Sequence, residues 1–142
     1  MPSYPAIIKI TNLRLRTLIG FNPEERTKPQ DVVINAEIHH DLNQGAMLDV
    51  IEDALNYKTI TKKMIHHVET NSFLLLEKLT ADLTAICSQH PSVKRAVVTV
   101  DKPHALRFAD SVSLTLEYDR KLHSNTQETL NEPEHTPFSK AS

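Results

Sequence analysis

The sequence has almost no glycine, with only Gly20 and Gly45 in 142 residues. Phosphate-binding loops of the Walker and Rossmann types need several closely spaced glycines, so both classes are excluded. Cys87 is the single cysteine, which excludes an internal disulfide and favours a reducing compartment. Long apolar runs and a signal-peptide pattern are also missing, so we expect no membrane partner and a cytoplasmic location.

Neither sign of charge predominates, because the sequence has 16 Lys and Arg and 18 Asp and Glu, which gives a net charge of -2. Sequence-independent nucleic-acid binding needs a basic surface, so we expect no nucleic-acid partner. The length suits one domain. Apolar periodicity stops at Asp119, and the remaining residues include few large apolar side chains. We therefore predict one domain over residues 1–119 and a disordered tail over 120–142.

Four segments have the pattern of strands. Apolar and polar residues alternate over 8–16, 32–39 and 112–118, and residues 93–100 are rich in β-branched side chains. The alternation changes phase near Asn12, which predicts a bulge or bend in the first strand.

Two segments between the second and third strands have helical periodicity. Apolar residues recur at three- and four-residue spacing over 60–68 and 75–87. Asn71 and Ser72 interrupt the pattern, and we expect Ser72 to cap the second helix. The order strand, strand, helix, helix, strand, strand predicts an α+β fold with both helices on one face of an antiparallel sheet. The polar residues expected on its second face are Arg14, Arg16, Asn35, Glu37, Thr99 and Thr115.

Eight histidines raise the question of a metal site. The pairs His39-His40 and His66-His67 are adjacent in sequence, so on a strand or helix their side chains diverge. Zinc-binding spacings of histidine and cysteine are missing, so we expect no metal. Cys87 lies on the apolar stripe of the second helix, where a small core residue is the simplest interpretation.

Several polar residues could serve catalysis or be ordinary surface groups, and their spacing alone favours the surface role. Lys102 ends a strand before Pro103 and could be an acid/base group. Glu77 lies near a helix start and could bind the paired N–H donors of an aminopyrimidinone ring. Glu25 lies in a loop, and Tyr57 precedes the first helix.

A small basic cluster follows Lys102 in the sequence. His104 and Arg107 lie within the same turn. Such a cluster could hold a phosphate, or it could be a solvated turn.

Four segments taken together resemble the dihydroneopterin aldolase family, and the resemblance runs from about Ala6 to Tyr118. The segments are Asn-Leu-Arg-Leu-Arg-Thr-Leu-Ile-Gly at 12–20, Asp-Ala-Leu-Asn-Tyr-Lys-Thr at 53–59, Phe-Leu-Leu-Leu-Glu-Lys-Leu-Thr at 73–80, and Asp-Lys-Pro-His-Ala-Leu-Arg-Phe-Ala-Asp-Ser at 101–111. The resemblance implies a tunnelling fold with a four-stranded antiparallel sheet and two helices on one face (ββααββ). It further implies rings of four subunits joined at their sheet edges, two rings stacked as an octamer, pterin sites between subunits, and no cofactor.

The resemblance also implies roles for individual residues. Lys102 matches the lysine that works as acid/base with an active-site water, and Glu77 matches the glutamate that anchors the pterin, with Leu76 beside it. Tyr57 matches a tyrosine supplied by a neighbouring subunit. Glu25 matches a loop glutamate near the substrate side chain.

Two features leave the assignment open in detail. Glu24 stands beside Glu25 and is an alternative to it. Aldolases commonly have a small residue after Lys-Pro, whereas His104 stands here, and this departure points to a branch of the family that holds a triphosphate through His104 and Arg107. The expected activity is epimerisation at C2' of 7,8-dihydroneopterin triphosphate. The alternatives are an aldolase that releases glycolaldehyde and a non-catalytic pterin-binding ring protein.

Overall fold

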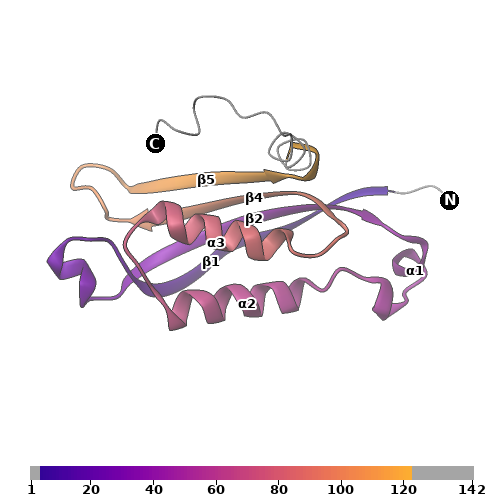
Figure 1. Cartoon of the computed structure of the whole chain (residues 1–142), viewed down its shortest axis with the longest axis horizontal. Helices are drawn as coiled ribbons and strands as arrows, with labels where there is room; N and C mark the ends of the chain where they lie inside the picture. Colours follow the sequence, from indigo (N-terminus) through magenta and orange to yellow (C-terminus); the bar gives the residue numbers. More distant parts are fainter. Residues whose placement is uncertain (1–3, 123–142) are drawn as a thin grey trace, which may run out of the picture.

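The computed structural model describes residues 4–122, which form one sheet covered on one face by two helices (Figure 1). In chain order the elements are β1 (Tyr4–Ile19), η1 (Pro23–Arg26), β2 (Gln30–Leu42), α1 (Gln44–Met47), η2 (Ile51–Asp53), α2 (Tyr57–Thr70), β3 (Ser72–Phe73), α3 (Leu76–Ser88), β4 (Val93–Pro103) and β5 (Ser111–Asp119). The strand order is β3-β1-β2-β4-β5, and the four long strands are antiparallel as predicted. Most of the predicted tail lies outside the described residues.

The short strand β3 corrects the prediction of four strands. Ser72 and Phe73 pair in parallel with Leu18 and Ile19, which adds a fifth strand at the edge of the sheet. The predicted capping role of Ser72 is wrong for the same reason, because its backbone belongs to this strand pair. The N-cap of α3 is Leu75, which makes no side-chain capping bond.

Other local predictions agree with the structure. The β1–β2 register shifts between Ile10 and Leu13, and Asn12 has a φ of 56°, so the bulge is where the alternation changes phase. Helix α2 starts at Tyr57, earlier than its apolar pattern indicated, because the Asn56 side chain accepts a hydrogen bond from the backbone N–H of Thr59 at 3.1 Å.

The core lies between the sheet and the helices α2 and α3. Ile34, Met64, Leu79 and Leu83 are fully buried there, and each such side chain contributes about 1.5–3 kcal/mol. Cys87 is also fully buried, and burial raises the pKa of its thiol to about 12. Its predicted place in the core is therefore confirmed.

The second face of the sheet is polar, as predicted. The Asp31 carboxylate forms ion pairs with both Arg14 and Arg16. Nζ of Lys9 lies 3.6 Å from Oε1 of Glu37. These pairs are exposed, and pairs of this kind contribute between zero and about 1 kcal/mol each. No helix within residues 4–122 has the length and apolar character that crossing a membrane would require.

Candidate active site

Lys102 lies on the helix side of the sheet, just beyond the core. Alternate residues of β4 face the same way, and Val98 and Val100 in the row that leads to Lys102 are fully buried. The Lys102 side chain is 13% exposed, and its Nζ lies 2.5 Å from Oε2 of Glu25. The strand thus places the Lys102 ammonium group at the edge of the core, in contact with the Glu25 carboxylate.

Glu25 is held in place by several groups. Besides Lys102, the Gln30 side-chain amide donates to Oε2 at 3.2 Å, and the Asn22 backbone N–H donates to Oε1 at 3.3 Å. The bond from Lys102 is the largest cause that lowers the pKa of Glu25, and it outweighs the opposing effect of burial. Of the two glutamates in this loop, it is Glu25 that the structure pairs with Lys102, while Glu24 is exposed.

Gly20 makes room for this carboxylate. A Cβ at position 20 would lie 2.2 Å from the carboxyl carbon of Glu25, and the φ of Gly20 is +125°, which side-chain-bearing residues rarely adopt. The residue that follows β1 therefore has to be glycine for Glu25 to reach Lys102.

A second set of bonds ties this loop to the segment before α3. The Gly20 N–H donates to the Phe73 carbonyl at 2.9 Å, and Arg26 Nη1 donates to the carbonyls of Gly20 and Phe73 at 3.1 and 3.3 Å. The chain then passes to Glu77, which lies exposed in the first turn of α3, and to Leu76, which packs partly against the core. The sequence offers no local signal for Arg26 or Gln30, because their roles depend on segments far apart in the chain.

A hollow of about 450 Å³ opens beside the Lys102–Glu25 pair. Its lining residues are Asn22, Pro23, Glu24, Glu25, Lys28, Gln30, His104 and Ala105. His104 has a φ of 62° in the turn between β4 and β5. Arg107 does not line the hollow, and its guanidinium lies 5.3 Å from the ring centre of Phe108 instead. The structure thus brings His104, but not Arg107, to the ion pair.

Tyr57 is the candidate residue that lies far from the others. It begins α2 and is half exposed, at the end of the molecule where α1 lies (Figure 1). Lys102, Glu25 and the start of α3 lie at the opposite end, where β1 and β4 finish. One chain therefore does not bring Tyr57 to the Lys102–Glu25 pair.

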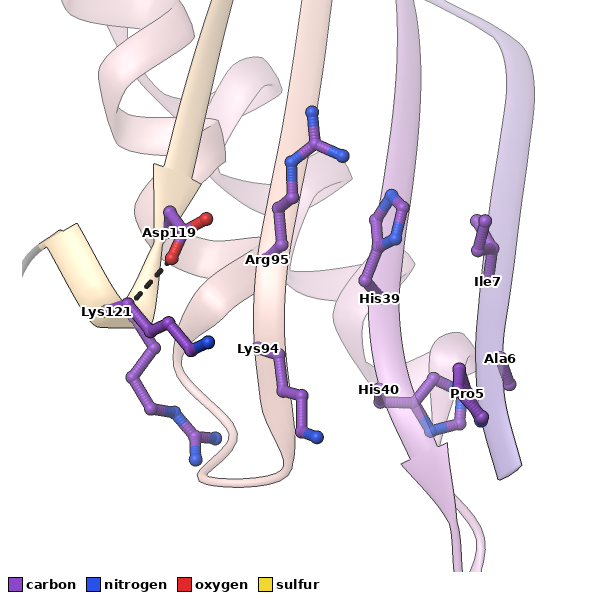
Figure 2. Close-up of a pocket in the computed structure, with 10 residues that line it drawn as sticks. Pro5, Ala6, Ile7, His39, His40, Lys94, Arg95, Asp119 and Lys121 are labelled. Carbon is purple, nitrogen blue, oxygen red and sulfur yellow. Dashed lines mark hydrogen bonds between the residues drawn. The ribbon is translucent and has the colours of Figure 1, made fainter. Parts of the chain in front are cut away.

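A second hollow, of about 510 Å³, lies at the end of the sheet where β1 and β4 begin (Figure 2). Three of its four Lys and Arg side chains already have partners. Lys94 binds Asp41 at 2.5 Å, and Arg95 binds Glu117. Arg120 donates to two backbone carbonyls. Across residues 4–122, no three His, Cys, Asp or Glu side chains are grouped to hold a metal ion. The half-buried acid/base pair therefore marks the first hollow as the candidate active site.

Comparisons with known proteins agree on one family. The family model described as dihydroneopterin aldolase matches residues 8–117. The dihydroneopterin triphosphate 2'-epimerase of Escherichia coli K12 is 54% identical over 115 residues, covering 81% of this chain and 96% of the relative. The Pseudomonas aeruginosa protein of the same name is 50% identical over 111 residues, with 78% and 90% covered. The crystal structure of E. coli dihydroneopterin aldolase in complex with neopterin superposes with a TM-score of 0.74 at 26% identity, covering 80% of this chain and 98% of that one.

Proposed function

The chain belongs to the dihydroneopterin aldolase family, and we propose that it epimerises C2' of 7,8-dihydroneopterin triphosphate to give dihydromonapterin triphosphate. Two relatives named for this reaction are each at least 50% identical, and each is covered over at least 90% of its length. The observation that carries the proposal is the half-buried Lys102–Glu25 ion pair beside an open hollow. Such a pair can take up and return a proton away from bulk water.

The proposed chemistry is a retro-aldol cleavage followed by re-addition. Removal of the 2'-hydroxyl proton lets the C1'–C2' bond break. Its electron pair forms a C6=C1' double bond, the π pair of N5=C6 moves onto N5, and N5 takes up a proton. The substrate supplies its own electron sink, so the route needs no cofactor. Lys102 is the proposed acid/base with a water, and Glu25, 2.5 Å away, can hold its proton in turn. The two-carbon aldehyde stays bound and turns its other face to C1'. C1' then attacks the aldehyde carbon, N5 gives up its proton as the N5=C6 bond re-forms, and the 2'-oxygen regains a proton.

Glu77 is the proposed anchor of the pterin ring, with Leu76 beside it. The Glu77 carboxylate is exposed in the first turn of α3, where it can accept two N–H bonds from the ring. The neighbouring side chains of Leu74 and Leu75 are 55% and 47% exposed, so they offer an apolar surface for the flat ring. His104 and Arg107 are proposed contacts to the phosphates, of which His104 already lines the hollow.

Tyr57 is proposed to reach this site from a neighbouring subunit in a ring. It lies at the end of the folded molecule opposite to Lys102 and Glu25, so only a second copy of the chain can supply it (Figure 1). Within residues 4–122, β5 has no strand on its outer side. The outer edge of β1 is paired only at Leu18 and Ile19, where β3 lies beside it. Open edges of this kind favour pairing between copies. Rings of four that stack into an octamer, in the cytoplasm, are part of the same proposal.

The identity of the products tests the proposal. Purified protein is incubated with dihydroneopterin triphosphate and, separately, with dihydroneopterin, and the pterins are resolved by chirality-sensitive chromatography while free aldehyde is measured. We expect the C2' epimer with little free aldehyde. Aldehyde released in step with a hydroxymethyl pterin would identify an aldolase, and binding without turnover would identify a non-catalytic pterin-binding protein.

A further inference from the structure

The hollow beside Glu25 is separate from the surface proposed for the pterin. Its lining comes from the loop around η1 and from the turn after β4, and it includes none of residues 74–77. A substrate with its ring at Glu77 and its C2' at Lys102 therefore leaves the hollow for whatever follows C3'. In dihydroneopterin triphosphate that group is the polyphosphate.

Most of the residues that line the hollow have no free backbone N–H with which to bind that anion. Pro23 has no N–H, and the donors already bonded within the chain belong to Asn22, Glu25, Lys28 and His104. The sequence also has no glycine in this loop after Gly20. Side chains are therefore the main groups left to hold the phosphates.

Lys28 is the cation that the hollow offers for this purpose. Its side chain is exposed and takes part in none of the ion pairs of the described residues, whereas Lys102 is already paired with Glu25. Glu24 lines the same hollow with the opposite charge. We propose that Lys28 joins His104 in binding the phosphate end of the substrate and that Glu24 opposes it, so that the charges of Lys28 and Glu24 tune the affinity for the triphosphate. This inference rests on the proposed function.

The sign of each effect follows from Coulomb's law. A unit charge near one phosphate charge at about 4 Å contributes about 1 kcal/mol in water, which is about a fivefold change in binding, and more where water is partly excluded. We therefore expect Lys28→Met to raise the KM for dihydroneopterin triphosphate at least about fivefold and Glu24→Gln to lower it. Both variants should leave the KM for unphosphorylated dihydroneopterin unchanged, because that substrate lacks the charge.

The matched control is Lys62→Met, which removes an exposed lysine from α2, outside the hollow. It should change neither KM, and all three variants should keep the melting temperature of the wild type. Equal effects of Lys28→Met on both substrates, or no effect on either, would overturn the inference.

Binding of inorganic triphosphate, measured by calorimetry on the same proteins, separates this inference from the proposed function. If the wild type makes no epimer, the proposed function fails, yet Lys28→Met should still weaken triphosphate binding while Lys62→Met does not. Unchanged triphosphate binding in Lys28→Met would overturn the inference even if the wild type is an epimerase.

Discussion

Replacing Gly20 by alanine should disturb both the stability of the fold and the geometry of the acid/base pair. The added Cβ would lie 2.2 Å from the carboxyl carbon of Glu25, and the φ of +125° is strained for any residue with a side chain. Backbone strain of this kind costs about 1–3 kcal/mol, whereas the new Cβ strikes only the tip of a flexible side chain, which can swing away. We therefore expect Gly20→Ala to lower the free energy of unfolding by about 1–3 kcal/mol through the backbone, and further by the loss of the bonds that hold Glu25. Glu25 must also move, which breaks its 2.5 Å contact with Lys102 and lowers turnover.

A double-mutant cycle separates the two costs. Glu25→Ala removes the atoms that the new Cβ would strike, so only the backbone strain remains in Gly20→Ala/Glu25→Ala. The double variant should lose less stability than the sum of the single variants, by about 0.5–3 kcal/mol. The assay is urea unfolding followed by circular dichroism at one fixed protein concentration, since association between copies would shift apparent stability. Strictly additive losses, or a Gly20→Ala protein with full stability and turnover, would refute the steric reasoning.

Three further predictions follow from buried or paired groups. Cys87, with its pKa raised to about 12, should not react with a thiol reagent until the protein unfolds; rapid labelling of the native protein would contradict its burial. Thr17→Val should cost about 1–3 kcal/mol in urea unfolding, because the buried hydroxyl bonds two backbone carbonyls, whereas Thr17→Ser should cost less. The pKa of Glu25 is lowered in the folded state, so its contribution to stability is present above its ordinary value of 4.5 and is lost as the pH falls through the folded value. The stability difference between wild type and Glu25→Gln should therefore shrink below pH 4.5, and a constant difference would argue against the pair.

Periodicity was enough to predict the long strands, both main helices and the polar second face. The phase change at Asn12 even located the bulge of β1. The two residues of β3 are too few to form any pattern, so the sequence predicts a helix cap at Ser72, whereas its backbone pairs with Leu18. At Ser72, pairing with a distant strand therefore determines the backbone conformation, and the local preference for a helix cap does not.

The site was less predictable than the fold, because its contacts join distant segments. The partners Glu25 and Lys102 are 77 positions apart, so spacing alone could not distinguish Glu25 from Glu24. Gln30 and Arg26 act on groups that only the folded chain brings near them. The family resemblance singled out Glu25 and Lys102, whereas the bonds that hold Glu25 are visible only in the structure.

The fate of hydrogen at C2' tests the proposed mechanism most directly. Wild-type protein is incubated with dihydroneopterin triphosphate in D₂O, and the epimer is isolated and analysed by NMR and mass spectrometry. Cleavage and re-formation of the C1'–C2' bond keep the original hydrogen on C2', because that carbon becomes the aldehyde carbon and is never deprotonated. We predict an epimer without deuterium at C2'. Deuterium at C2', or no epimer at all, would contradict the account.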